Sequence, residues 1–294
     1  MQMKRSFAHL VLSSLPRPLV ENAASIFRGS PLLRRSYNRM TASLKDRDSV
    51  IAAGPGRGLR FNSGASDSRF LLGTFEPALQ AFLAGQLKPG MVFYDVGANV
   101  GFLSLIAAKL VGPGGEVHCF EPLPENVQRI RHNITLNGMN NVLVHPLAIG
   151  KRDGTAQFRI SERPTFGALS DSPMEVDRQI GTLDVSVRCL DGLFSERQLR
   201  PPDIIKVDIE GSEVDFFAGA EMLLRRFRPV LLIELHGTNA DVAAWLQKLS
   251  YNSDIVGGGE IATAPWAALA LATPRDRPET QAFARTVCNK FHGR

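Results

Sequence analysis

The stretch FYDVGANVGF, residues 93–102, ends an apolar run with an acid and continues into a turn of small residues. The run MVFYDV (91–96) lies between a Pro-Gly pair and Gly97, which predicts a short strand buried on both faces. The following segment, GFLSLIAAKL (101–110), has helical spacing. In a doubly wound sheet, ligands bind beyond the carboxyl ends of the strands, and we expect this turn to lie there.

Outward from this stretch, apolar runs and helical patterns alternate along the chain. The predicted elements are strands at 116–122, 141–150, 203–211 and 229–237, helices at 124–138, 212–227 and 239–250, and a last strand at 267–273 that can run antiparallel. This alternation predicts an α/β fold with a doubly wound, mostly parallel sheet and helices on both faces. Two further alternating segments, 155–161 and 182–190, predict an added pair of strands.

The length and the composition of the chain limit the number of domains and the classes of protein that it can belong to. A chain of 294 residues with 44% hydrophobic residues can form one or two domains with a sizeable core. We expect a basic helical extension at 1–60 and one α/β domain at 61–294, with its core at about 70–240. The net charge of +5 permits an acidic partner without requiring one. Three cysteines without a C-x-x-C pair fit a reducing cytoplasm, where we expect the protein to be.

The N-terminal segment carries the strongest charge bias. Residues 1–42 contain seven Lys or Arg and one acid, Glu21. This pattern favours a peripheral helical extension and leaves contact with a membrane surface open. The first apolar run is too short and too polar for a secretory signal, and we expect no transmembrane segment.

The glycine turn departs from the dinucleotide fingerprint G-x-G-x-x-G. Counted from Gly97, that fingerprint needs glycine where the chain has Asn99 and Phe102. Asp95 would place a negative charge near a pyrophosphate, which disfavours an NAD-dependent oxidoreductase. The same carboxylate suits a ligand with a cationic amine and no phosphate, such as S-adenosylmethionine. Gly97 and Gly101 would let the backbone approach that ligand closely.

A second acid follows the next predicted strand. HCFEP places Glu121 24 residues after Gly97, near the spacing expected for an acid that binds ribose. A carboxylate can accept hydrogen bonds from both ribose hydroxyls. The two motifs together predict a nucleoside-binding site.

With these motifs the chain resembles the class I S-adenosylmethionine-dependent methyltransferases, and within them the FkbM family. The resemblance covers roughly residues 70 to 240 and rests on DVGANVG, FEP, LN and KVDIEGSE. It implies a Rossmann-like methyltransferase fold and S-adenosyl-L-methionine as the cofactor.

The resemblance also implies which residues bind that cofactor. Around its methionine and ribose these are Glu76, Asp95, Gly97, Asn99, Gly101, Glu121 and Asp208. Around its adenine these are Pro122, Leu123, Asn126, Asn137 and Ala148.

Methyl transfer to a hydroxyl needs a general base or a metal ion, because an alcohol is a poor nucleophile at neutral pH. In one interpretation, Asp208 holds the cofactor and either Glu210 or His236 acts as the base. In a second, Asp208, Glu234 and His236 bind a divalent metal ion, which we do not expect. In a third, these groups cap helices or pair with Lys206, whose own role we expect to be a structural ion pair.

The substrate class is narrowed by motifs that the chain lacks. No N/D-P-P-Y/F turn follows the 203–211 strand, and no cysteine follows a proline, which disfavours methylation of nucleic-acid bases. The resemblance implies O-methylation of a hydroxyl on a small molecule, sugar or glycan. The length of the loop at about 161–181 favours a lid that sets specificity, and the alternative is a plain surface loop. The alternative is a non-catalytic or nucleic-acid-binding relative that uses the basic N-terminus, although we expect no nucleic-acid partner. The sequence does not fix the oligomeric state.

Overall fold

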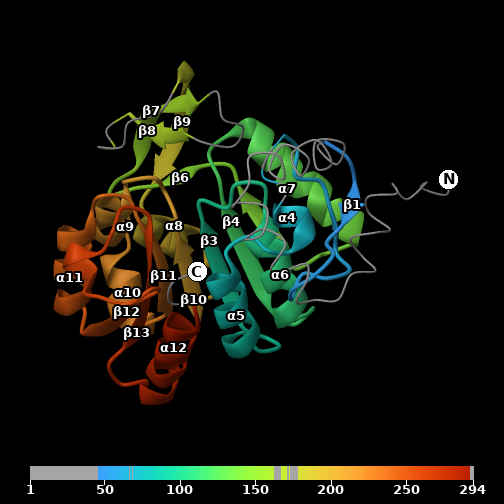
Figure 1. The fold of residues 1–294 in the computed structure, drawn as a ribbon. Helices are drawn as coiled ribbons and strands as arrows, with labels where there is room; N and C mark the ends of the chain where they lie inside the picture. The colour runs from blue at the N-terminus through green and yellow to red at the C-terminus, as the bar shows by residue number, and fades with distance from the viewer. Residues whose placement is uncertain are drawn as a thin grey trace.

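The computed structural model describes residues 46–65, 67, 69–161, 167–170, 172 and 178–291, which form a central sheet with helices on both faces (Figure 1). The sheet has seven strands in the order β12 (Tyr251–Ile255), β13 (Ala268–Pro274), β11 (Val230–Leu235), β10 (Ile204–Val207), β3 (Val92–Val96), β4 (Glu116–Phe120) and β5 (Val142–His145). β13 runs antiparallel to both of its neighbours, and the other pairs are parallel. The predicted doubly wound, mostly parallel sheet is confirmed.

The strand β3 is buried at all five positions, as its apolar run predicts. Because successive side chains alternate between the two faces of a strand, β3 contributes to two cores. Phe93 belongs to one core, and Tyr94 belongs to the other.

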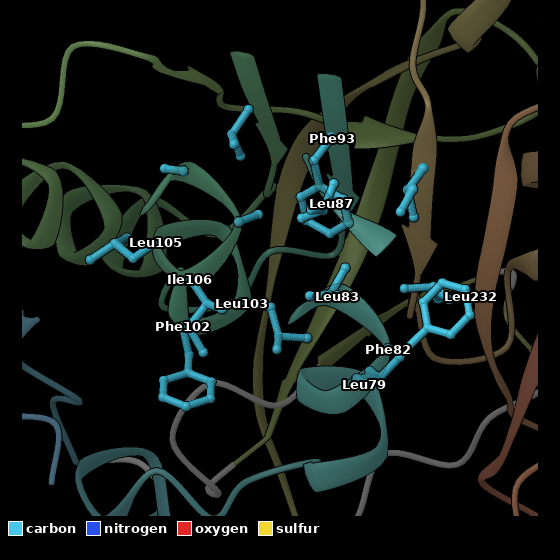
Figure 2. Packing of buried hydrophobic residues seen from close by; sticks show 14 of the residues in the cluster. Leu79, Phe82, Leu83, Leu87, Phe93, Phe102, Leu103, Leu105, Ile106 and Leu232 are labelled. Atoms are coloured by element: carbon cyan, nitrogen blue, oxygen red, sulfur yellow. The ribbon is translucent and has the colours of Figure 1, made fainter. Parts of the chain in front are cut away.

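The two cores are covered by different helices. On the face of Phe93 lie α4 (Arg69–Leu72), α5 (Pro77–Gln86), α6 (Phe102–Val111), α7 (Pro124–Asn137) and α12 (Pro278–Lys290). On the face of Tyr94 lie α8 (Leu190–Arg197), α9 (Glu213–Gly219), α10 (Glu221–Phe227) and α11 (Asn239–Lys248). Figure 2 shows side chains of α5 and α6 in the first core, together with Phe93 and Leu232.

Two predicted elements are divided in the structure. The segment 141–150 was expected to form one strand, but β5 ends at His145 and the short strand β6 (Ala148–Ile149) belongs to another sheet. Pro146 lies between the two strands. The ladder is interrupted there because proline has no N–H to donate. The helix expected at 212–227 divides into α9 and α10 at Ala220, which has a non-helical φ of −124°.

A second, four-stranded sheet lies at the top of Figure 1, beyond the carboxyl edge of the central sheet. Its order is β6, β9 (Gln179–Arg188), β7 (Gly154–Ser161) and β8 (Gly167–Leu169). β7 and β9 are antiparallel, which confirms the added pair of strands predicted from their alternation. Most of the predicted lid, 161–181, lies outside the described residues.

The ends of the chain hold further elements. Most of the predicted extension at 1–60 lies outside the described residues, and its described part includes β1 (Ser49–Val50) and the first residue of β2 (Arg60–Phe61). Ile51 and Phe61 are fully buried in the core that contains Phe93. Beyond 250, β12, the short 3₁₀ helix η1 (Ile261–Thr263) and α12 were not predicted. Within the described ranges, every helix is too short or too polar to cross a lipid bilayer.

Candidate ligand-binding and catalytic site

A cavity opens at the carboxyl edge of the central sheet, beside the point where strand order reverses between β3 and β10. It encloses about 590 Å³ of empty space, its open mouth included. The lining comes from the turn after β3, the segments after β4 and β5, the turn after β10, and the added sheet.

The turn after β3 lines the cavity and also packs against the end of the neighbouring strand β10. Gly97 has a φ of +80°, and a Cβ atom there would lie 1.8 Å from the carbonyl oxygen of Asp208. Any side chain at this position would therefore push the ends of β3 and β10 apart. Asn99 also has a positive φ, +53°, and lines the cavity. Gly101 begins α6 and faces α7 instead of the cavity.

Glu121 lies at the cavity wall directly after β4 and is 5% exposed. Its Oε2 accepts a hydrogen bond from the backbone N–H of Asn99 at 2.8 Å. Its Oε1 accepts hydrogen bonds from the N–H of Leu123 at 2.9 Å and from Nδ2 of Asn126 at 3.2 Å. Burial raises the pKa of Glu121 to about 7, although these hydrogen bonds lower it. The carboxylate is thus fixed in position, and its backbone donors belong to the two turns that line the cavity.

Lys206 lies at the centre of the site, although the sequence suggested only a structural ion pair. Its Nζ donates a hydrogen bond to the carbonyl oxygen of Gly97 at 2.8 Å. The same atom lies 3.4 Å from Oδ1 of Asp95 and 3.2 Å from Oδ2 of Asp208. Burial lowers the pKa of Lys206, but Asp208, Asp95 and Glu76 outweigh it and raise the pKa above its usual range. The ammonium therefore joins the ends of β3 and β10.

Asp95 was expected to line the cavity, but it lies behind the lining and is 1% exposed. Its Oδ2 accepts a hydrogen bond from the hydroxyl of Ser104, at 2.5 Å, and its Oδ1 faces Lys206. Burial raises the pKa of Asp95, opposed by Lys206. The side chain is enclosed because α6 and β10 pack over it, which spacing within the motif does not reveal.

Two more carboxyl groups reach the same edge from α5 and β11. Glu76, at the start of α5, has a φ of +43°, and its Oε2 has no hydrogen-bond partner among the described residues. Burial raises the pKa of Glu76 to about 8 and that of Glu234 to about 9. Ligand atoms of Glu76, Asp208 and Glu234 lie within 4.8 Å of one another. Both acids therefore carry a proton through much of the neutral range.

Glu210, His236 and Glu213 form a chain of carboxylate, imidazole and carboxylate. Nδ1 of His236 lies 3.0 Å from Oε1 of Glu213, and Nε2 lies 3.3 Å from Oε2 of Glu210. Glu213 is fully buried and also accepts hydrogen bonds from the N–H of Gly211 and the hydroxyl of Thr238. It therefore fixes both the turn after β10 and the imidazole.

The two predicted bases, Glu210 and His236, differ in their pKa values. Burial lowers the pKa of His236, but the hydrogen bond to Glu213 and the charges of Asp208 and Glu210 raise it to about 9. Burial raises the pKa of Glu210 to about 7. At neutral pH His236 is therefore protonated and cannot accept a proton, which argues against it as the base. Glu210 lines the cavity, and its Oε2 has no hydrogen-bond partner among the described residues.

Among the residues that the structure describes, two groups of side chains have the spacing of metal ligands. One contains Asp208, Glu210 and His236, and the other contains Glu76, Asp208 and Glu234. The sequence suggested that Asp208, Glu234 and His236 bind one metal ion together. In the structure, Glu234 and His236 fall in different groups, and only Asp208 belongs to both. Lys206 already supplies a positive charge 3.2 Å from the aspartate that both groups share.

The remaining predicted residues fall into two sets. Pro122, Leu123 and Ala148 line the cavity, and Asn126 supports Glu121 from behind. Asn137 lies elsewhere: its side chain exchanges hydrogen bonds with the backbone of Arg60 in β2, at 2.9 and 2.7 Å.

Part of the cavity wall was not predicted. These lining residues are Phe120, Ile149, Phe158, Gly167, Leu169 and Ile209. The alternating pattern at 155–161 predicted the strand that carries Phe158, but no motif indicated that this strand folds over the cavity.

The fold and the cavity define a doubly wound, Rossmann-like α/β protein with its ligand site at the switch point. The Methyltransferase FkbM domain matches residues 95–255, and the chain belongs to that family. This confirms the resemblance drawn from the motifs.

Two curated proteins illustrate the similarity. The chain is 30% identical over 153 residues to the 2-O-methyltransferase NoeI of Sinorhizobium fredii, covering 48% of this chain and 62% of that protein. It is also 30% identical over 162 residues to the 31-O-demethyl-FK506 methyltransferase FkbM of Streptomyces tacrolimicus, covering 46% and 62%. The chain thus matches less than two thirds of the length of either relative.

A crystal structure of a methyltransferase FkbM from Methylobacillus flagellatus is also similar. It has a TM-score of 0.43 and 17% sequence identity, and the match covers 70% of this chain and 55% of that one.

Proposed function

We propose that this protein transfers a methyl group from S-adenosylmethionine to a hydroxyl oxygen of a small molecule, sugar or glycan. The observation that carries the proposal is Glu210, a carboxylate at the cavity wall that lies 3.3 Å from the imidazole of His236 and whose pKa is raised by burial to about 7. A general base works best when its pKa is near the working pH.

The described residues fit this cofactor. Glu121 offers two oxygens at the cavity wall, as the two hydroxyls of a ribose require. Phe120, Leu123 and Phe158 provide an apolar lining for a flat base. Asp208 and, once it has lost its proton, Glu76 lie at the same edge of the sheet and suit an ammonium group. S-Adenosylmethionine supplies an electrophilic methyl group when it is bound.

The residues of the chain would position the acceptor and remove its proton. An acceptor hydroxyl near the carboxylate of Glu210 would donate its proton to that carboxylate. His236 is positively charged, and its Nε2 lies 3.3 Å from Oε2 of Glu210, so it favours the ionised form of Glu210 and holds its orientation. Lys206 holds Asp208 close to the turn that contains Gly97.

The names of two similar proteins support oxygen as the acceptor atom. NoeI is named a 2-O-methyltransferase, and the FkbM protein of Streptomyces tacrolimicus acts on 31-O-demethyl-FK506. The protein AglP of Haloferax volcanii, 23% identical over 178 residues, is named a hexuronic acid methyltransferase. Sugars and hydroxylated small molecules are therefore the first acceptors to test.

The test is a comparison of Glu210→Gln with the wild type. We expect kcat to fall about 10²- to 10⁴-fold, because removing a general base typically costs that much, while the affinity for S-adenosylhomocysteine stays unchanged. Wild-type kcat should rise with pH through about 7 and then level off, because the carboxyl must lose its proton to act as a base. Glu260→Gln, at an exposed position, is the matched control.

Other outcomes would contradict this proposal. Equal rates for wild type and Glu210→Gln would exclude Glu210 as the base. A rate that is lost with a chelator and restored by a divalent ion would favour the metal interpretation. Failure of the protein to bind S-adenosylhomocysteine by calorimetry would exclude the cofactor assignment.

A further inference from the structure

Trp266 is a large apolar side chain exposed beside the carboxyl cluster. It is 57% exposed, which is unusual for a side chain whose burial would be favourable. Its ring lies 6.1 Å from the imidazole of His236, at an interplanar angle of 73°. The other large exposed apolar side chains in the described ranges, Leu143, Ile180 and Met222, belong to β5, β9 and α10.

The indole is seated on the backbone that follows β11. A Cβ atom on Gly237 would lie 2.5 Å from Cζ3 of Trp266, so the ring packs directly over this glycine. Gly237 has a φ of +81° and follows His236. Any other residue at 237 would displace the ring, and the contact therefore fixes Trp266 at the edge of the site.

The loop that carries Trp266 is held on both sides. Nδ2 of Asn239 donates hydrogen bonds to the carbonyl oxygens of Ile261 and Ala264, at 3.2 and 2.8 Å. The N–H of Ala267 donates to the carbonyl oxygen of Leu235 at 2.8 Å. A side chain on a loop that is anchored in this way is pre-organised, and binding to it costs little conformational entropy.

Trp266 lies close to the group that the proposed acceptor must reach. Glu210 lines the cavity of the proposed cofactor. Nε2 of His236 lies 3.3 Å from Oε2 of Glu210, and the ring of Trp266 lies 6.1 Å from the same imidazole. An acceptor held on Trp266 would therefore lie within two side chains of the proposed base.

We propose that Trp266 is the platform on which the acceptor stacks, and that the acceptor is a sugar ring. This inference rests on the proposed methyl transfer to a hydroxyl. A pyranose presents a face of C–H groups that packs on an indole, while its hydroxyls remain at the edge of the ring. One of those hydroxyls would then lie towards Glu210.

The test uses the fluorescence of Trp266 as a direct report of binding. The chain has two tryptophans, and Trp245→Phe leaves Trp266 as the single one. Trp245 stacks on Phe217 in α9, so phenylalanine there keeps an aromatic contact. In the presence of S-adenosylhomocysteine, we titrate this variant with neutral methyl pyranosides and with an acyclic alditol.

We expect neutral pyranosides to shift the emission of Trp266 to shorter wavelength with saturation, and the alditol to leave it unchanged. Trp266→Leu, which keeps an apolar contact with Gly237, should weaken pyranoside binding about tenfold by calorimetry, in line with the loss of an aromatic contact. Trp266→Phe should retain most of the affinity. Both variants should bind S-adenosylhomocysteine as the wild type does.

Three results would overturn the inference. One is a pyranoside that binds by calorimetry without changing the emission of Trp266. Another is binding that is unchanged in Trp266→Leu, or lost only together with the thermal midpoint, which would indicate a purely structural side chain. The third is a failure of every neutral pyranoside to bind. Failure of the proposed methyl transfer is separate, because it appears as absent binding of S-adenosylhomocysteine to the wild type or as equal rates for the wild type and Glu210→Gln, and neither measurement involves Trp266.

Discussion

Glu121 and the group around Lys206 are two buried carboxylate sites at one edge of the sheet, and they are stabilised differently. Glu121 accepts three hydrogen bonds from uncharged donors, all within 22 residues along the chain. Asp95 and Asp208 instead share the ammonium of Lys206, whose contact with Gly97 spans 109 residues. The first site is thus built locally, and the second is built by the pairing of β3 with β10.

This difference indicates that the first site serves ligand binding and the second holds the strands together. A carboxylate surrounded by neutral donors keeps its charge available to a ligand, because no cation in contact neutralises it. A carboxylate paired with a buried ammonium is partly neutralised, and loss of either partner leaves an uncompensated charge. We therefore expect Glu121 to affect ligand affinity most, and Lys206 to affect stability most.

The largest expected effect is the loss of stability in Lys206→Met. Removing one partner of a buried ion pair typically costs about 3–5 kcal/mol of unfolding free energy, because the other charge stays buried. Chemical denaturation monitored by circular dichroism measures it. The matched control is Lys151→Met, which removes an exposed pair with Asp215 at 3.5 Å and should change stability far less.

A double variant sharpens this prediction. Lys206→Met with Asp95→Asn should recover part of the lost stability, because the asparagine carries no charge. If the single and double variants unfold at the same denaturant concentration, the comparison between the two sites fails.

The next effect concerns affinity. Glu121→Gln should weaken binding of S-adenosylhomocysteine about 10- to 100-fold, since a hydrogen bond to a charged group contributes roughly 1.5–3 kcal/mol. Calorimetry measures the dissociation constant. Glu125→Gln, an exposed position in the first turn of α7, is the control. Unchanged affinity in Glu121→Gln would show that this wall does not bind the ribose.

The smallest effect concerns Asn137, which the motif placed near the adenine and the structure places against β2. Asn137→Ala should lower the unfolding free energy by about 1 kcal/mol, because it removes hydrogen bonds to the backbone of Arg60. The affinity for S-adenosylhomocysteine should not change. Weaker binding in this variant would restore Asn137 to the site.

The sequence was most informative where a motif and its contacts lie close together in the chain. Glu121 and the turn after β3 could be placed from the spacing of two strands, because parallel strands bring their carboxyl ends to one edge. The division of 141–150 was missed, since a run that is apolar on both sides of Pro146 reads as one strand. Phe158 was not predicted to line the cavity, because an alternating pattern predicts a strand but not the part of the fold against which that strand packs.

The sequence by itself determined the alternation of strands and helices, the family, and the edge of the sheet at which the acids gather. Those features depend on apolar periodicity and on short motifs, which are properties of neighbouring residues. The tertiary structure alone decided that Asp95 is enclosed, that Lys206 is central and that His236 carries a proton. Burial and the distance between charges set those properties, and both arise only when β3, β10 and β11 pack together.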